Sequence, residues 1–318
     1  MTSSKTAVNT LSKAVTNEKS IWSRIARDKY LYIMLFPFIL WFLIFAYKPM
    51  YGFLIAFKDY SMFKGIEASP WVGFDNFIEF LNNPYFERTL KNTVMISLYS
   101  IIFAFPMPII LALMLNEVRQ VKFKKIIQTV TYIPYFISLV VIAGMVANFL
   151  APEHGLLNLI LSGLGKDKIF FLSRPEYFRS IFTIMNIWKY TGFDAIIYIA
   201  ALAGVSAELY EACRIDGGGK LRQLWHITLP GIMPTIIIML ILKVGTILDV
   251  NYESIILLYQ PATYETADVI STYVYRLGIL GDQQALATAV GLFNSVIALV
   301  LVMIANVISR KVSEISLW

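Results

Sequence analysis

The chain contains few of the residues from which metal sites, disulfides and hydrolytic active sites are built. Its 318 residues include one cysteine, Cys213, and two histidines, His154 and His226. One cysteine excludes an internal disulfide framework and a cysteine-rich metal site, and two histidines are too few for a histidine cluster. The sequence also lacks a Ser/His/Asp arrangement and a Gly-rich phosphate loop. It therefore predicts no catalytic residue and no metal site, and any ATP has to be bound by another chain.

Charged residues are scarce as well. They make up 15% of the chain, against 58% hydrophobic residues, and the mean hydropathy is +0.65. A soluble globular domain carries roughly 25% charged residues, so this composition indicates that a lipid bilayer surrounds most of the chain. The net charge of +6 would suggest nucleic acid as the partner of a soluble protein. Here it is typical of basic residues that flank membrane spans, and we predict no nucleic-acid partner.

Six long apolar runs alternate with charged segments. We predict transmembrane helices at about 30–47, 93–115, 126–150, 180–204, 230–258 and 285–308. Pro106 and Pro108 predict a kink in the second helix, and Pro134 predicts a distortion of the third. Basic residues are densest before the first helix, after the last, and in the loops at 119–125 and 214–222. The positive-inside rule then places both termini in the cytoplasm.

The longest polar stretch of the second half lies between the fourth and fifth runs. Residues 211–230 read EACRIDGGGKLRQLWHITLP. The small side chains of Ala212 and Cys213 allow another surface to approach the backbone closely, and Gly217 with the two glycines after it allows a sharp bend. Pro230 suits the first turn of a following helix. The predicted fold class is thus an all-α polytopic membrane protein with six transmembrane helices and a cytoplasmic helical loop between helices four and five, shaped for docking.

This stretch resembles the EAA loop of permease subunits of binding-protein-dependent ABC importers. The family pattern is Glu-Ala-Ala, three residues, Gly, nine residues and Ile-x-Leu-Pro, and the chain matches it with Cys213 in place of the second alanine. In that family the loop is the coupling helix that sits in a cleft of the ATPase subunit. The resemblance implies that the ATPase-coupling residues are Glu211, Ala212, Cys213, Arg214, Asp216, Gly217, Leu229 and Pro230.

The resemblance also implies the partners of the chain. They are a second homologous permease subunit that forms a heterodimer with it, two cytoplasmic ATPase subunits that bind ATP and Mg, and an extracellular solute-binding protein. This chain would bind no cofactor and would lie in the bacterial inner membrane. The implied organisation is a cytoplasmic tail (1–29), a first span with an outer amphipathic segment (30–91), a permease core (92–310, with the EAA loop at 205–230) and a cytoplasmic end (311–318).

Several segments resemble the polysaccharide-type branch of the carbohydrate permeases. They are 71–77, 243–250, 264–276 and 289–295. The resemblance implies import of oligosaccharides derived from polysaccharides by alternating access, and lysines on the predicted path hint at acidic sugars. Where relatives commonly have Gly-Phe-Glu, this chain has Asn251-Tyr252-Glu253, a difference that bears on the choice of sugar.

Ionisable residues also lie inside the predicted spans, where they normally face a polar interior or water. The fifth span carries Asp249 and Glu253 four residues apart, which would place them on one helix face. Two interpretations remain open: a polar and aromatic path for a hydroxyl-rich solute, or internal ion pairs that lock the fourth span to the fifth. The candidate path residues are Lys189, Tyr190, Asp194, Lys243, Asp249, Asn251, Tyr252 and Glu253.

Two other protein classes compete with the importer subunit. A self-contained, ion-coupled secondary transporter would explain the charges inside the spans as a proton or sodium relay. It gives no reason for the docking loop, and it predicts an inverted repeat that the sequence does not show. A membrane-embedded enzyme would need a catalytic cluster that the sequence lacks.

Overall fold

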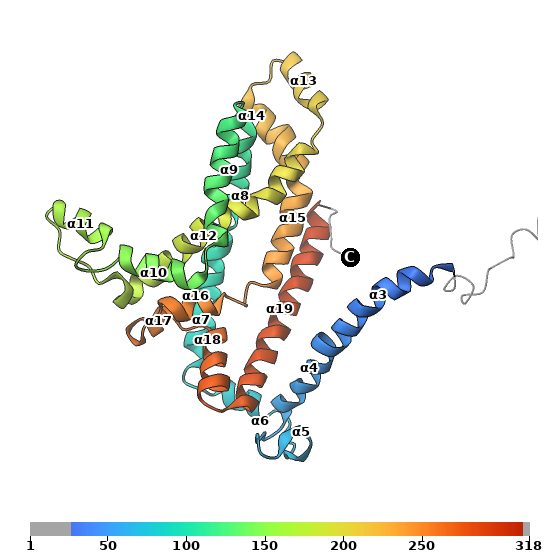
Figure 1. The fold of residues 1–318 in the computed structure, drawn as a ribbon, viewed down its shortest axis with the longest axis vertical. Coiled ribbons are helices and arrows are strands. Elements are labelled where there is room, and N and C mark those ends of the chain that lie inside the picture. The colour runs from blue at the N-terminus through green and yellow to red at the C-terminus, as the bar shows by residue number, and fades with distance from the viewer. Residues whose placement is uncertain (1–26, 314–318) are drawn as a thin grey trace, which may run out of the picture. The chain divides into compact units, whose positions relative to one another are not determined.

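The computed structural model describes residues 27–313, and these divide into two compact units, up to Leu54 and from Ile55 onward. Within the described residues every regular element is helical, and β-structure is limited to one antiparallel bridge between Lys58 and Trp71 (Figure 1). The predicted terminal segments 1–29 and 311–318 lie largely outside the described residues. The all-α fold class is confirmed.

The described part of the first unit is most of the first candidate span, whose last three residues belong to the second unit. This 29-residue helix, Lys29–Phe57, joins α3 (Lys29–Phe42), a π-helical turn (Leu43–Tyr47), α4 (Lys48–Met50) and a 3-10 turn (Tyr51–Phe57). It is apolar on all sides, as a helix surrounded by lipid is. The predicted span at 30–47 is confirmed and continues ten residues further.

Three further helices are long and apolar enough to cross a membrane. They are Phe86–Glu117, Lys220–Gly245 and Gln284–Lys311. The first joins α7 (Phe86–Tyr99) to α8 (Pro106–Glu117) through a π-helical turn, Ser100–Ala104. The turn lies directly before Pro106, because proline cannot donate to the helix ladder and its ring crowds the preceding turn. The predicted kink is therefore a π turn. The last span is α19 (Gln284–Ser313).

Two spans are strongly bent. α9 (Val121–Phe136) meets α10 (Leu139–Phe149) at 101°, and α12 (Pro175–Ala203) meets α13 (Ala207–Ile215) at 67°. The distortion predicted at Pro134 in the helix at 126–150 is a complete break, because Ile137 and Ser138 are extended and Ser138 caps the next helix by accepting from the Val141 N–H. Residues 27–313 contain six candidate spans if each bent pair crosses once.

The predicted fifth helix at 230–258 is wrong at both ends. It starts ten residues earlier, as α14 (Lys220–Gln223), a π turn (Leu224–Thr228) and α15 (Leu229–Gly245). After Gly245 the chain is irregular until α16 (Tyr252–Leu258), which is capped by the Asn251 side chain. Asp249 therefore lies in the break and Glu253 in the first turn of α16, so the two residues do not share the face of one helix.

The remaining elements are short and join the spans. They are α5 (Gly65–Ala68), α6 (Asp75–Leu81), α11 (Leu156–Gly163), α17 (Tyr264–Ala267), α18 (Ile270–Tyr275) and short 3-10 or π turns at Phe171–Ser173, Pro261–Thr263 and Arg276–Leu280.

Helix α12 is the central element of the second unit, and it packs against α8, α9 and α15. Gly192 permits the contact with α9, since a Cβ there would lie 2.0 Å from the Thr131 carbonyl oxygen. Towards α13, a core of small and apolar residues joins α8, α12 and α15; its buried members are Ala112, Ala195, Tyr198, Leu202 and Ile232. This core holds α12 and α15 together near the loop that joins them.

Candidate functional site

The loop predicted to dock folds as a helix, a turn and a helix. α13 ends at Ile215, and Gly217 adopts a left-handed φ of +75° that L side chains rarely adopt. The turn is closed by the Gly218 N–H, which donates to the Cys213 carbonyl at 2.7 Å. Gly218 is also required for space, since a Cβ there would lie 2.3 Å from Cys213 Sγ. The sharp glycine bend between two short helices is confirmed.

Side-chain contacts hold this loop firmly on its span. The Tyr210 hydroxyl lies 3.0 Å from the Thr228 hydroxyl in the π turn, and Lys220 Nζ pairs with Glu117 of α8 at 2.5 Å. At the base, Gly231 faces Val205, whose Cγ2 would lie 2.8 Å from an added Cβ. A force on the loop is therefore transmitted to α15 rather than absorbed by a flexible linker.

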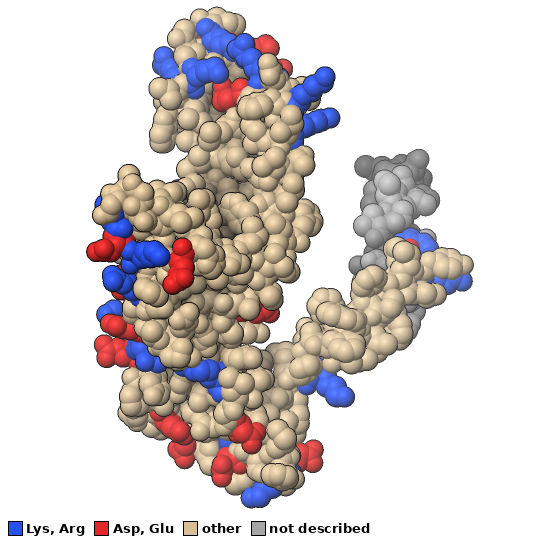
Figure 2. Space-filling model, turned by 60° about the vertical axis from the view of Figure 1, so that its left-hand side comes forward, with Lys and Arg blue, Asp and Glu red and all other residues tan. Residues whose placement is uncertain are grey.

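The outer face of the loop carries apolar side chains that the sequence prediction missed. Ile215, Leu221 and Trp225 are 86%, 74% and 66% exposed. Figure 2 shows basic side chains gathered at the end of the molecule formed by α13 and α14, above a surface without charged residues. Apolar residues surrounded by charge form the usual centre and rim of a protein interface. Three large apolar side chains in an otherwise polar loop are the feature of the sequence from which this surface could have been predicted.

The predicted coupling residues divide by exposure. Glu211, Ala212, Arg214, Asp216 and Gly217 are exposed on the loop. Cys213 is half-buried against Gly218, while Leu229 and Pro230 belong to the first turn of α15. Pro230 is exposed as well, whereas Cys213 and Leu229 are half-buried beneath the loop surface.

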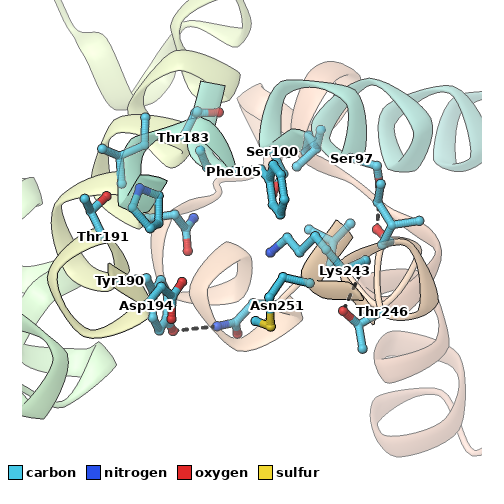
Figure 3. Close-up of a pocket in the computed structure, with 18 of the residues that line it drawn as sticks. Ser97, Ser100, Phe105, Thr183, Tyr190, Thr191, Asp194, Lys243, Thr246 and Asn251 are labelled. Atoms are coloured by element: carbon cyan, nitrogen blue, oxygen red, sulfur yellow. Dashed lines mark hydrogen bonds between the residues drawn. The ribbon is translucent and has the colours of Figure 1, made fainter. Parts of the chain in front are cut away.

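A cavity of about 470 Å³ lies between α7, α8, α12, α15 and the break after α15 (Figure 3). Five of the predicted path residues line it: Tyr190, Asp194, Lys243, Asp249 and Asn251. Figure 3 shows Tyr190 and Asp194 of α12 on one side and Lys243 of α15 on the other. The sequence prediction missed the small polar side chains of the wall, which are Ser97, Ser100, Thr183, Asn186, Thr191 and Thr246.

The charged groups of the cavity are free for a solute to contact. Within residues 27–313, no hydrogen bond or ion pair joins the side chain of Lys243, Asp194 or Asp249 to another residue. Asn251 donates its amide to the Tyr190 hydroxyl at 3.3 Å, which fixes both side chains. Carboxylates, an ammonium group and an amide can bind hydroxyl groups, and tyrosine rings can stack on the C–H face of a sugar. Lys243 is the basic residue of the lining.

Three predicted path residues lie outside the cavity lining. Lys189 is 5% exposed and donates its Nζ to the carbonyls of Ile137 (2.6 Å) and Tyr135 (3.2 Å). These carbonyls are released where α9 breaks, and a backbone oxygen inside a membrane needs another donor, so Lys189 caps the broken helix. Tyr252 and Glu253 begin α16, and the Tyr252 ring packs against Tyr275.

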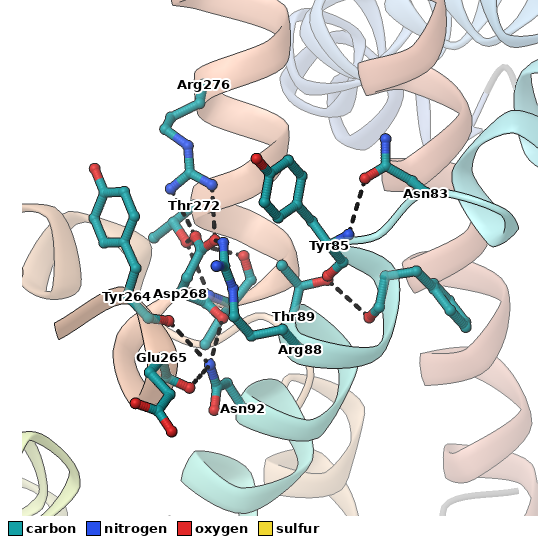
Figure 4. A network of polar contacts seen from close by, with 12 residues as sticks. Asn83, Tyr85, Arg88, Thr89, Asn92, Tyr264, Glu265, Asp268, Thr272 and Arg276 are labelled. Carbon is teal, nitrogen blue, oxygen red and sulfur yellow. Dashed lines mark hydrogen bonds and ion pairs between the residues drawn. The ribbon is translucent and has the colours of Figure 1, made fainter. Parts of the chain in front are cut away.

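A second polar cluster, centred on Asp268, was not identified from the sequence. Asp268 lies between α17 and α18 and its side chain is fully buried. Its carboxylate accepts two bonds from Arg276, both 2.7 Å long, and one from Arg88 of α7 at 2.8 Å (Figure 4). Burial alone would lower the pKa of Arg276, but hydrogen bonding and the charge of Asp268 outweigh it and raise the pKa. Arg276 therefore remains charged, and the Asp268 carboxylate is paired with both guanidinium groups.

Asn92 connects the same cluster to α12. Its amide donates to the carbonyls of Glu265 and Asp268, each at 3.0 Å, and its oxygen accepts from Arg179 at 2.9 Å. Asn92 and Arg179 each lie one helical turn before cavity residues, Ile96 on α7 and Thr183 on α12. The cluster thus fixes the ends of the helices that form the cavity.

Comparison with known proteins agrees with this architecture. Residues 104–314 match the family model of the binding-protein-dependent transport system inner membrane component. The chain is 45% identical to protein LplB of Bacillus subtilis over 92% of both chains. It is 43% identical to the polygalacturonan/rhamnogalacturonan transport system permease protein YteP of the same organism, over 93% of this chain and 92% of that protein.

A solved structure matches as well. It is a chain of a bacterial alginate ABC transporter in complex with an alginate pentasaccharide-bound periplasmic protein, with a TM-score of 0.87, 48% identity, and coverage of 94% of this chain and 100% of that chain. The family match spans the docking loop, the cavity helices α12 and α15 and the last span. The chain belongs to the family of inner membrane components of binding-protein-dependent transport systems.

Proposed function

We propose that this chain is one of two unlike permease subunits of an ATP-driven importer that carries oligosaccharides into the cytoplasm. The proposal rests on the cavity. Charged side chains without a salt-bridge partner in the described chain lie there beside an amide and aromatic rings, among the helices that lead to the docking loop. Family membership argues against the self-contained, ion-coupled secondary transporter, because members of this family depend on a binding protein.

The docking loop is the proposed contact with the ATPase. Its exposed Ile215, Leu221 and Trp225 would enter a cleft of the ATPase subunit, with Arg214 and Asp216 at the rim. ATP and Mg would be bound by two such ATPase subunits, and no cofactor by this chain. Closure of the ATPase dimer would move α12 and α15 as levers and switch the cavity between outside-open and inside-open states. An extracellular binding protein would deliver the solute.

The proposed solutes are acidic oligosaccharides. YteP is named for polygalacturonan and rhamnogalacturonan transport, and the matched solved structure belongs to an alginate transporter. Lys243 forms no salt bridge within the described chain, although it attracts the nearby Asp194 electrostatically, and it would supply a cation for a sugar carboxylate. Asp194 and Asp249 would accept hydrogen bonds from hydroxyl groups.

Neutralising Asp249 tests the cavity as the solute path. We expect Asp249→Asn to change the uptake of the solute by roughly ten- to a hundredfold, which corresponds to the ~1.5–3 kcal/mol of a hydrogen bond to a charged group. Assembly and thermal stability should stay normal, because the side chain has no hydrogen-bond or ion-pair partner within residues 27–313. Glu253→Gln is the matched control, since Glu253 lies outside the lining. Normal uptake by Asp249→Asn would exclude this residue from the path, and loss of assembly would show a structural role.

The proposed orientation places both termini and the docking loop in the cytoplasm. In sealed cells, Cys213 should not react with an impermeant thiol reagent, and it should react after permeabilisation if the ATPase leaves it uncovered. An Ile160→Cys variant in a Cys213→Ser background should react from outside, because Ile160 is an exposed residue of α11, on the segment between the third and fourth spans. Reaction of Cys213 in sealed cells would invert this orientation.

A further inference from the structure

The loop at 58–71, called the tip loop here, is a closed and rigid structure. It follows the first span, and its two ends are joined by the bridge between Lys58 and Trp71. The Asp59 N–H donates to the Pro70 carbonyl at 2.9 Å. The Asn76 amide then fixes the base, because it donates to the carbonyls of Ala56 (2.8 Å) and Lys58 (3.1 Å). Such a loop presents its side chains in fixed positions.

Polar groups of the tip loop are bonded within the loop itself. The Ser69 hydroxyl donates to the Gly65 carbonyl at 2.7 Å and accepts from the Ser61 N–H at 3.2 Å. Lys58 directs its Nζ inward to the Ile66 carbonyl at 2.6 Å. These bonds stabilise the loop from within, whereas the charged side chains of Lys64 and Glu67 remain exposed.

Large apolar side chains also project from the tip loop and its base. Phe63 is fully exposed, and Met62, Trp71 and Phe74 are 63%, 62% and 66% exposed. The Trp71 ring stacks on Phe57 with centroids 5.6 Å apart, and Phe74 contacts the same Phe57 ring edge to face. The aromatic side chains are thus held outward by packing from behind, which is a costly arrangement in water.

Three candidate spans have an end at this part of the molecule. The first span ends at Phe57 directly before the loop, and the second begins at Phe86 after α6. Phe80 of α6 is buried against Leu286 and Val290 in the first turns of α19, with Phe86 packed on the same cluster. Figure 1 shows α5 and α6 beside this end of α19. The tip loop therefore lies at the level where these spans leave the hydrocarbon core.

We propose that the tip loop inserts Phe63 and Met62 into the bilayer at the boundary between headgroups and acyl chains, with Trp71 and Phe74 at headgroup level. Tryptophan and other amphipathic or aromatic side chains are enriched at this boundary. Lys64 follows Phe63 directly and is exposed, so it is placed to meet lipid phosphates while the apolar pair enters the bilayer. The loop would fix the depth of the second span and of α19 in the membrane.

Depth-dependent quenching tests this placement. In a Cys213→Ser background, Phe63→Cys is labelled with the fluorophore NBD, and the full importer complex is reconstituted in vesicles of phosphatidylcholine and phosphatidylglycerol. Phe63 is fully exposed, so the label displaces no packing. We expect blue-shifted emission, loss of most of the emission with spin-labelled lipid, and little quenching by iodide. Glu67→Cys, on exposed α5 of the same loop, is the matched control and should be quenched by iodide.

Two results would overturn the proposal. Quenching of the label at position 63 by iodide and not by spin-labelled lipid would place the tip in water. Protection from both quenchers would place it against a protein, such as the partner permease or the binding protein. As an independent check that needs no label, brominated lipid should quench the wild-type complex more than its Trp71→Phe variant. Equal quenching of the two would exclude Trp71 from the bilayer boundary.

Discussion

The Gly217→Val variant is expected to lose transport at least about tenfold while the chain still inserts into the membrane. Gly217 has a φ of +75°, and a β-branched residue held there is strained by ~1–3 kcal/mol. The space around it is open, so the effect arises from the backbone and not from a clash. Relief of that strain would change the angle between α13 and α14, and with it the surface formed by Ile215 and Leu221.

The neighbouring glycines supply controls for this experiment. Gly219 also has open space, but its φ of −75° and ψ of 177° suit any residue, so Gly219→Val should leave the bend intact. Gly218→Ala should be harmful for a different reason, the 2.3 Å approach to Cys213 Sγ. Solute uptake, ATP hydrolysis and copurification of the ATPase would be measured on all three. Full transport by Gly217→Val, or equal loss in Gly219→Val, would contradict a docking role for the bend.

The docking loop could be predicted from the sequence because its features are local. A run of three glycines after small residues determines a bend without reference to distant residues, although the helix after it starts at Lys220 and not at Pro230. The approximate positions of the spans could also be predicted, because composition is a local feature of the sequence. The membrane requires long apolar helices wherever the chain crosses it.

The breaks in the spans could not be predicted, because they depend on contacts between distant residues. The carbonyls released at Ile137 are stabilised by Lys189, 52 residues along the chain. The break after Gly245 places Asp249 and Asn251 in the cavity and receives a bond from Ser97 of α7, which donates to the Ile247 carbonyl at 2.5 Å. Pro134 indicates a distortion near the first break but not its angle, and the apolar run at 230–248 gives no sign of the second. Five of the predicted path residues line the cavity, but the continuous fifth helix assumed for them was wrong.

Asp268 was missed for a related reason. A single aspartate in the apolar stretch after α17 gives no sign that it is paired, because Arg88 lies 180 residues away and Arg276 lies beyond the next short helix. Only the fold brings two guanidinium groups to one carboxylate. The Tyr264 and Tyr273 rings then cover Arg276, with centroids 4.8 and 5.9 Å from its Cζ.

The Asp268→Ala variant is expected to lose about 3–5 kcal/mol of stability, since removal of one partner of a buried ion pair leaves the other charges uncompensated. Folded proteins have only ~5–15 kcal/mol in total, so the yield of assembled complex and its thermal midpoint in detergent should both fall sharply. Glu265→Ala is the control, because the Glu265 side chain is exposed and only its backbone carbonyl contacts the cluster. A normal midpoint for Asp268→Ala would contradict the assigned pairing.

A triple variant distinguishes the contribution of the ion pairs to stability from that of side-chain packing. Asp268→Leu combined with Arg88→Met and Arg276→Met removes all three charges together. Replacing a whole buried ion network by apolar residues of similar size is often neutral or stabilising. We therefore expect the triple variant to recover much of the stability lost in Asp268→Ala.

If the triple variant is as unstable as the single one, the loss comes from the packing of Asp268 and the Thr272 hydroxyl that donates to it at 2.9 Å, and not from unpaired charge. Recovery of stability without recovery of uptake would show that the cluster also sets the position of α7 and α12 around the cavity, through Asn92 and Arg179.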